Sequence, residues 1–231
     1  MLQKDDERDE HIGFIRKVLG IVAAQMLVTF SMSLAASFDD KIGRLVKNPF
    51  VYLSSIMLLM TCFCILMCSS HVRKSVPQNY FWLFGFTLGE SVMIAAIASE
   101  LKTESVVTSI MATCVLTACL FFAALNTSTS VHSTTLIRNL ALGVVGALIL
   151  TLVFNLIFIF TWAYGVMDRW MIVVYSCLVC VISGIYIIFA LLMLIIPGMT
   201  DKDDYILGAL RLYIEIARLF MYVLIILGDK K

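Results

Sequence analysis

The sequence predicts an all-α integral membrane protein, a bundle of seven transmembrane helices. Of its 231 residues, 61% are hydrophobic and 14% are charged, and the mean hydropathy is +0.98. Soluble globular chains are nearer to about 45–50% apolar and about 25% charged. A water-soluble fold of this size cannot hide so much apolar surface, so a bilayer has to supply the apolar solvent. The apolar runs are continuous rather than alternating, which indicates helices and not a β-barrel.

Seven apolar runs are each close to the roughly 20 residues that a spanning helix needs. The expected spans are residues 18–38, 50–70, 80–99, 105–125, 137–162, 170–196 and 206–228. Residues 18–228 would then form one membrane domain between an N-terminal tail, 1–17, and a C-terminal tail, 229–231. The connections are short, so consecutive helices are expected to be antiparallel neighbours. Gly85 and Gly89 are expected to pack against another helix of the same chain rather than against a second copy.

The first apolar run is expected to remain as an anchor, because it is too long for a signal peptide and mixed charges precede it. Arg16 and Lys17 lie before this run and Lys41 lies after it. Under the positive-inside rule, this pattern favours a cytosolic N-terminal tail. If the last run enters the membrane only part-way, both tails would lie in the cytosol.

Charged residues interrupt two of the expected spans. Glu90 lies in the middle of the third span, and the seventh contains Arg211, Glu215 and Arg218. Translocon scales give a cost of about 2.5–3.5 kcal/mol for an Asp, Lys or Arg at a helix centre, so such groups need partners or a water-filled cavity. Spacings of four and three residues place the three charges of the seventh span on one helix face. That face is expected to point into the bundle and to meet Glu90.

Ionisable residues inside a membrane indicate an ion or proton pathway, with Glu215 as a candidate pH sensor. A polar clamp that only ties helices together is the alternative. Asn155 and Gln25 are expected to make helix–helix hydrogen bonds and are candidates to add oxygen ligands. Two carboxylates are too few for a tight Ca²⁺ site, so only weak and transient Ca²⁺ binding is expected.

Other chemistry finds little support in the sequence. The histidines His11, His71 and His132 lie in the tail or in loops, and no zinc-protease or serine-hydrolase motif is present, so neither an enzyme nor a cofactor is expected. Cys177 and Cys180 have the spacing of a redox or metal motif, but thiols packed on a buried helix are the preferred interpretation because no histidine neighbours them. The net charge of +1 indicates no nucleic-acid partner.

Three segments, in order and spacing, resemble the transmembrane Bax-inhibitor-motif family in its lifeguard and Golgi anti-apoptotic branch. They run from Phe14 to Thr29, from Val72 to Glu90, and from Asp204 to Phe220. The last segment is similar to the family ending Glu-Tyr-x-x-Ala-x-x-Leu-Tyr-Leu-Asp-Ile-Ile-Asn-Leu-Phe. The resemblance spans nearly the whole chain. It implies a seven-helix bundle of the Bax-inhibitor type with a central last helix, a pH-sensitive Ca²⁺ leak and protection from apoptosis.

Members of that family pair an aspartate in the sixth helix with one in the seventh. Here the seventh-helix position is Glu215, and residues 183–200 contain no acid. We therefore expect a Ca²⁺-permeable leak channel or regulator of intracellular calcium stores with an altered pH response. Glu215 would contact the ion, and Glu90 would be a second carboxylate. Arg211 would be a counter-ion that lowers the leak when paired, with Arg218 on the same helix face.

The alternative function is a non-conducting membrane scaffold that regulates cell death by binding partner proteins, and a proton-coupled transporter is a third. The expected surroundings are the lipid bilayer of the Golgi or endoplasmic reticulum, rather than the plasma membrane. The expected partners are Ca²⁺ or protons and other membrane proteins of apoptosis or calcium signalling.

Overall fold

The computed structural model describes residues 2–130, 168–196, 200–201 and 204–231, apart from the side chains of 2–8 and 128–130. This part of the chain is helical, which confirms the all-α prediction. The long helices are α1 (Leu2–Phe38), α3 (Pro49–Cys68), α5 (Gln78–Ala98), α6 (Thr103–Ser130), α8 (Arg169–Ile195) and α9 (Tyr205–Leu227). Two short helices, α2 (Asp40–Val46) and α4 (Ser70–Lys74), connect α1 to α3 and α3 to α5.

Five of the described helices are long and apolar enough to cross a membrane: α3, α5 and α8, residues 9–38 of α1 and residues 103–127 of α6. Helix α9, with 23 residues, is also long enough, but it contains three charges. The expected span 137–162, with Asn155, lies outside the described residues. The chain is therefore an all-α membrane protein, and the total of seven spans stays a prediction.

The helix ends differ from the expected spans mainly at the N-terminus. Helix α1 begins at Leu2 instead of residue 18, because the charged residues before the apolar run are good helix formers and continue the helix beyond it. Helices α2 and α3 begin at ordinary capping residues. The Asp39 carboxylate accepts a hydrogen bond from the Lys41 backbone N–H at 2.8 Å, and the Asn48 side chain accepts one from that of Phe50 at 3.0 Å.

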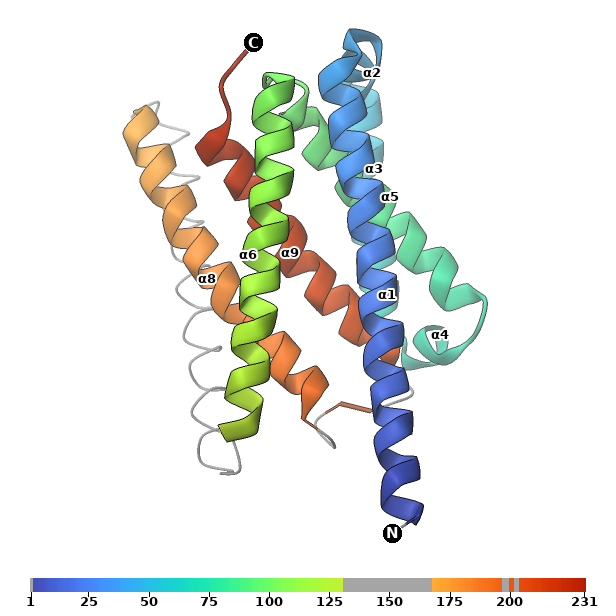
Figure 1. The fold of residues 1–231 in the computed structure, drawn as a ribbon. Helices are drawn as coiled ribbons and strands as arrows, with labels where there is room; N and C mark the ends of the chain where they lie inside the picture. Colours follow the sequence, from blue (N-terminus) through green and yellow to red (C-terminus); the bar gives the residue numbers. More distant parts are fainter. Residues whose placement is uncertain (1, 131–167, 197–199, 202–203) are drawn as a thin grey trace.

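Helix α9 occupies the middle of the bundle. It contacts α1, α4, α5, α6 and α8, and Figure 1 shows it inclined between them. Its side chains Leu210, Tyr213 and Phe220 are fully buried. In contrast, large apolar side chains such as Leu53 on α3 and Met111 on α6 are exposed. This pattern, with apolar residues outside as well as inside, is the one a bilayer requires.

The two ends of the bundle can be followed in Figure 1. The end near α4 and the N-terminus is called the lower end, and the end near α2 and the C-terminus is called the upper end. Helices α1, α5 and α9 run from the lower end to the upper end, so α5 and α9 are parallel. Residues at equal distances from the starts of α5 and α9 therefore lie at similar depths.

The glycines of α5 face α3. A Cβ added at Gly85 would lie 2.9 Å from the Cys62 sulfur, and one added at Gly89 would lie 2.9 Å from the Leu59 Cβ and from the Ser55 carbonyl oxygen. Small residues allow membrane helices to approach this closely. The expectation that these glycines pack within the chain is confirmed.

Gly89→Ala is expected to lower the thermal stability of the purified protein in detergent, because the new methyl group meets the α3 backbone. Overpacking of this kind costs about 1–3 kcal/mol. Gly20→Ala in α1 is the matched control, since nothing lies within 4 Å of its added Cβ. A Gly89→Ala variant that unfolds at the wild-type temperature would contradict the close α3–α5 contact.

Candidate functional site

Helix α9 contains an intrahelical ion pair. The Arg218 Nη1 atom donates to both carboxylate oxygens of Glu215 at 3.2 Å. The Glu215 side chain is 16% exposed and that of Arg218 is 31% exposed, so both are largely withdrawn from the surroundings. Such a pair lowers the cost of placing each charge in the membrane, because the charges compensate one another.

Glu90 of α5 is the second carboxylate considered together with the Glu215–Arg218 pair. Its side chain is partly buried, and among the described residues it forms no ion pair, whereas Glu215 pairs with Arg218. Among the described residues, Glu90 forms no ion pair with Arg211, and Arg211 itself is exposed there. The counter-ion expected at Arg211 is therefore found at Arg218. Two acids and one arginine, Glu90, Glu215 and Arg218, give this cluster a negative formal charge.

Both acids lie near the middles of their helices. Glu215 comes ten residues after Tyr205, and Glu90 comes twelve residues after Gln78, where the two parallel helices begin. At about 1.5 Å per residue, these positions are about 15–18 Å along the helices from their starts. If both helices begin at the membrane boundary, this places the acids near the centre of a hydrocarbon core about 30 Å thick.

A hydroxyl network ties α9 to α1 and α5 at the same depth. The Thr29 hydroxyl donates to the Gln25 carbonyl oxygen at 3.1 Å, and it lies 2.8 Å from the Tyr213 hydroxyl and 3.0 Å from the Ser91 hydroxyl. With the Thr29 proton used in this way, Tyr213 and Ser91 donate to Thr29. Tyr213 is two residues before Glu215, and Ser91 directly follows Glu90, so the network fixes the helices at the level of the acids without contacting them.

Gln25 forms a second bridge from α1 to α5. Its Nε2 atom donates to the Thr87 hydroxyl at 2.8 Å, as the expected helix–helix hydrogen bond requires. Its Oε1 atom is buried without a hydrogen-bond partner among the described residues. Gln25 therefore has one oxygen atom without a hydrogen-bond partner among the described residues. This oxygen could act as the additional ligand for which the sequence makes Gln25 a candidate.

The lower end of α9 is held by a different ion pair. The Arg73 Nε atom donates to both carboxylate oxygens of Asp204 at 3.0 Å, and its Nη2 atom lies 2.9 Å from Asp204 Oδ2. Both side chains are 11% exposed. The Arg73 Nη1 atom donates to the carbonyl oxygens of Leu66 and Met67 at the end of α3. Arg73 thus joins three segments: the end of α3, α4 and the start of α9.

Three further side chains secure the start of α9. Asn79 donates to the Tyr205 hydroxyl at 3.0 Å and to the Arg73 carbonyl oxygen at 3.0 Å. The Lys17 ammonium lies 3.4 Å from the centre of the Tyr205 ring, which is a cation–π contact. Helices α1, α4 and α5 therefore close the lower end around Tyr205.

Sequence reasoning missed both the hydroxyl network and the lower ion pair. The sequence does contain a pattern that indicates the hydroxyl network. Gln25, Thr29 and Ser33 recur every four residues on α1, and all three are buried. Arg73 and Asp204 gave no such signal. They are 131 residues apart and flank apolar runs, where charged residues usually meet water.

The family resemblance implies an aspartate in the sixth helix, and the structure has apolar side chains at that place. Leu191 and Leu192 of α8 are buried there, packed in the apolar core, and α8 contacts α9.

The prediction that Cys177 and Cys180 are both packed on a buried helix is wrong for Cys177. Cys180 is half-buried but Cys177 is exposed, because the outer face of a membrane helix is apolar too. Within the described residues, no three His, Cys, Asp or Glu side chains form a group that could hold a metal ion.

These observations define a polytopic α-helical membrane protein with ionisable residues on its central helix. The chain belongs to the family described as inhibitor of apoptosis-promoting Bax1, which matches residues 11–231 and confirms the resemblance. Its relatives include protein lifeguard 3 of Homo sapiens, 26% identical over 229 residues, or 98% of this chain and 71% of the relative. The protein lifeguard 3 of Mus musculus is 25% identical over 98% of this chain and 72% of its own. Protein LIFEGUARD 3 of Arabidopsis thaliana is 24% identical over 93% of this chain and 84% of its own.

Thr29→Val is expected to destabilise the bundle by about 1–2 kcal/mol, because it keeps the side-chain shape but leaves the Tyr213 and Ser91 hydroxyls without their shared acceptor. Thermal unfolding in detergent measures this loss. Thr61→Val is the matched control, because Thr61 is exposed and its hydroxyl donates only to Met57 of its own helix. Equal stabilities of the two variants would show that the network contributes nothing.

Arg73→Gln is expected to destabilise the lower end strongly, since losing one partner of a buried ion pair costs about 3–5 kcal/mol. Lys74→Gln provides the comparison. The Lys74–Asp201 pair has an N–O distance of 2.8 Å, but its side chains are 43% and 59% exposed, and exposed pairs contribute about 0–1 kcal/mol. Limited proteolysis near residue 204, together with thermal unfolding, distinguishes the Arg73→Gln and Lys74→Gln variants. If Lys74→Gln is as harmful as Arg73→Gln, burial does not set the strength of these pairs.

Proposed function

We propose that this chain is a Ca²⁺-permeable leak channel or a regulator of intracellular calcium stores, with an anti-apoptotic role. One observation supports this most: Glu90 and Glu215 lie near the middles of α5 and α9, and of these two acids only Glu215 forms an ion pair among the described residues, with Arg218. The negative balance favours a cation at this depth. A purely structural clamp would not need an excess of acid there.

The proposed permeation is weak and transient. Calcium prefers six to eight oxygen ligands, and this place offers two carboxylates with the spare Gln25 oxygen nearby. An ion passing the site would compete with Arg218 for Glu215. Protons would compete for the same oxygens, which makes the leak pH-dependent. In this mechanism Arg218 takes the counter-ion role first expected of Arg211, and it lowers the leak when paired.

Further parts of the proposal follow from the family and the charge pattern. The bundle has seven spans, with 137–162 and α9 added to the five described. The N-terminus and the lower end face the cytosol, in Golgi or endoplasmic reticulum membranes. The protein acts without a cofactor and without catalysis. Its partners are the bilayer, Ca²⁺ or protons, and membrane proteins of apoptosis or calcium signalling.

A non-conducting scaffold is the second candidate function. The observation that favours it is the apolar packing of Leu191 and Leu192, where the family resemblance implies an aspartate. A scaffold would regulate cell death through partner proteins alone. Purified protein in Ca²⁺-loaded vesicles separates the two functions, because a scaffold leaks no faster than empty vesicles.

Glu215→Gln is expected to lower Ca²⁺ efflux from loaded liposomes and to flatten its dependence on pH, because the variant removes the charge that contacts the ion. A fluorescent Ca²⁺ indicator outside the vesicles measures the efflux between about pH 5 and pH 8, the range in which proteins tend to be most stable. Glu104→Gln, an exposed change at the upper end of α6, is the matched control. Unchanged efflux with an unchanged pH profile would rule out Glu215 as the ion-contacting group.

A further inference from the structure

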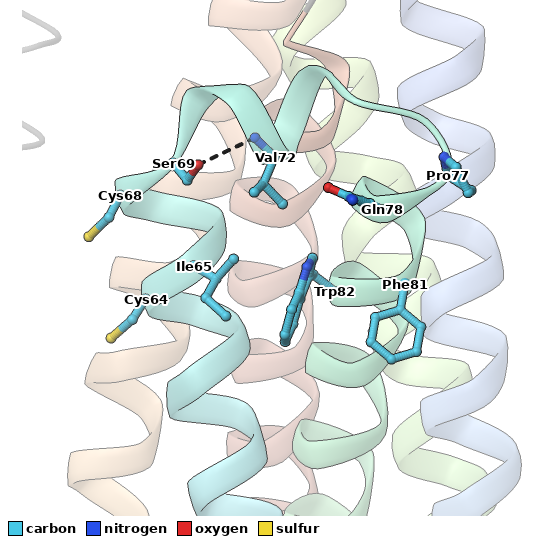
Figure 2. A pocket seen from close by; sticks show the side chains of 9 residues that line it. All are labelled: Cys64, Ile65, Cys68, Ser69, Val72, Pro77, Gln78, Phe81 and Trp82. Carbon is cyan, nitrogen blue, oxygen red and sulfur yellow. Dashed lines mark hydrogen bonds between the residues drawn. The ribbon is translucent and has the colours of Figure 1, made fainter.

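Two exposed cysteines lie at the edge of a cavity at the lower end of the bundle. The cavity has a volume of about 1010 Å³ and lies where α3, α4 and α5 meet. Its lining is mainly apolar and includes Ile65, Val72, Phe81 and Trp82. Figure 2 shows Trp82 between the two long helices and shows Cys64 and Cys68 one turn apart on the same side of α3.

The position of Cys68 differs from that of every other cysteine. All seven cysteines are free, and five are exposed: Cys64, Cys68, Cys114, Cys119 and Cys177. Cys68 is the last residue of α3. Ser69 then caps α4, which contains His71, Arg73 and Lys74, so Cys68 lies at the boundary between the apolar span and a polar, basic segment.

The exposed thiols other than Cys64 and Cys68 lie far from the ends of their helices. Cys114 comes eleven residues after the start of α6, and Cys119 lies eleven residues before its end. Cys177 comes eight residues after the start of α8. At about 1.5 Å per residue, these thiols are about 12–16 Å from the helix ends. A water-borne reagent or enzyme reaches Cys68 far more easily than any of them.

We propose that Cys68, with Cys64 as a second site, is S-acylated by a long-chain fatty acyl-CoA. Cysteines next to a membrane span are the usual acceptors of this modification. The Cys68 sulfur attacks the thioester carbonyl carbon and a new C–S bond forms. The bond between that carbon and the coenzyme A sulfur breaks, and the coenzyme A thiol leaves with the proton that Cys68 loses. No oxidant or reductant is needed.

The attached chain would lie along the outer side of α3. A thiol at the end of α3 holds the acyl carbonyl at the polar boundary, while the hydrocarbon tail extends toward the membrane interior. In Figure 2 the Cys64 and Cys68 side chains point to the side of α3 away from Trp82, so the tail would run past Cys64 in the bilayer rather than through the cavity.

The proposal is independent of ion permeation, but it rests on the proposed cytosolic orientation of the lower end, where acyl-CoA is available. The test expresses the full chain in cells fed an alkyne analogue of palmitate, followed by purification and coupling to a fluorophore. The expected result is a label that hydroxylamine removes, which falls at least about fivefold in Cys64→Ser/Cys68→Ser and mainly in Cys68→Ser. The controls Cys114→Ser and Cys177→Ser should keep the wild-type label.

Several results would overturn the proposal: no label, a hydroxylamine-resistant label, or a label that the double variant retains. A disulfide between Cys64 and Cys68, found by mass spectrometry of the peptide, would also overturn it. Size-exclusion profiles in detergent verify that the double variant is folded. Protease digestion of sealed microsomes reports the orientation separately. An unlabelled protein with a cytosolic N-terminus contradicts the acylation alone, whereas a lumenal N-terminus contradicts the proposed orientation as well.

Discussion

The bilayer core offers no hydrogen-bond partners, so every polar group on a central helix has to be satisfied by the protein itself. Helix α9 contains the polar groups that need this most. Glu215 and Arg218 pair within the helix, and Tyr213 reaches Thr29 on α1. Burying these groups in lipid would be unfavourable, so α9 lies inside and the mainly apolar faces of the other helices lie outside.

The central helix is held at two levels with different strengths. At the lower end, Arg73 binds Asp204 in a largely buried, multiply hydrogen-bonded ion pair. At the centre, neutral hydroxyls and one shared arginine hold α9 more weakly, because neutral hydrogen bonds between membrane helices average only about 0.6 kcal/mol. Small rearrangements at the centre are therefore less costly than release of the lower end. This difference fits a leak in which the central acids respond to ions while the bundle stays assembled.

The sequence was sufficient to predict the helical fold, because apolar runs of spanning length have few other solutions. Helices α3 and α8 end within two residues of the expected spans. The family resemblance also located the acid of the last helix at Glu215. The side chains that the charged residues contact could not be predicted. Glu90 was expected to meet the face formed by Arg211, Glu215 and Arg218, but Arg211 is exposed, because the rotation of α9 depends on packing by buried residues such as Tyr213 and Phe220.

The central claim is that the charge of Arg218 offsets both Glu90 and Glu215. A double-mutant cycle with Glu90→Gln, Arg218→Gln and the double variant tests it most directly, with thermal unfolding in detergent as the measurement. The shared charge predicts a coupling free energy of at least about 1 kcal/mol, so the double variant is more stable than the sum of the single losses implies. Losses that add to within about 0.5 kcal/mol would contradict the shared arginine and the site built on it.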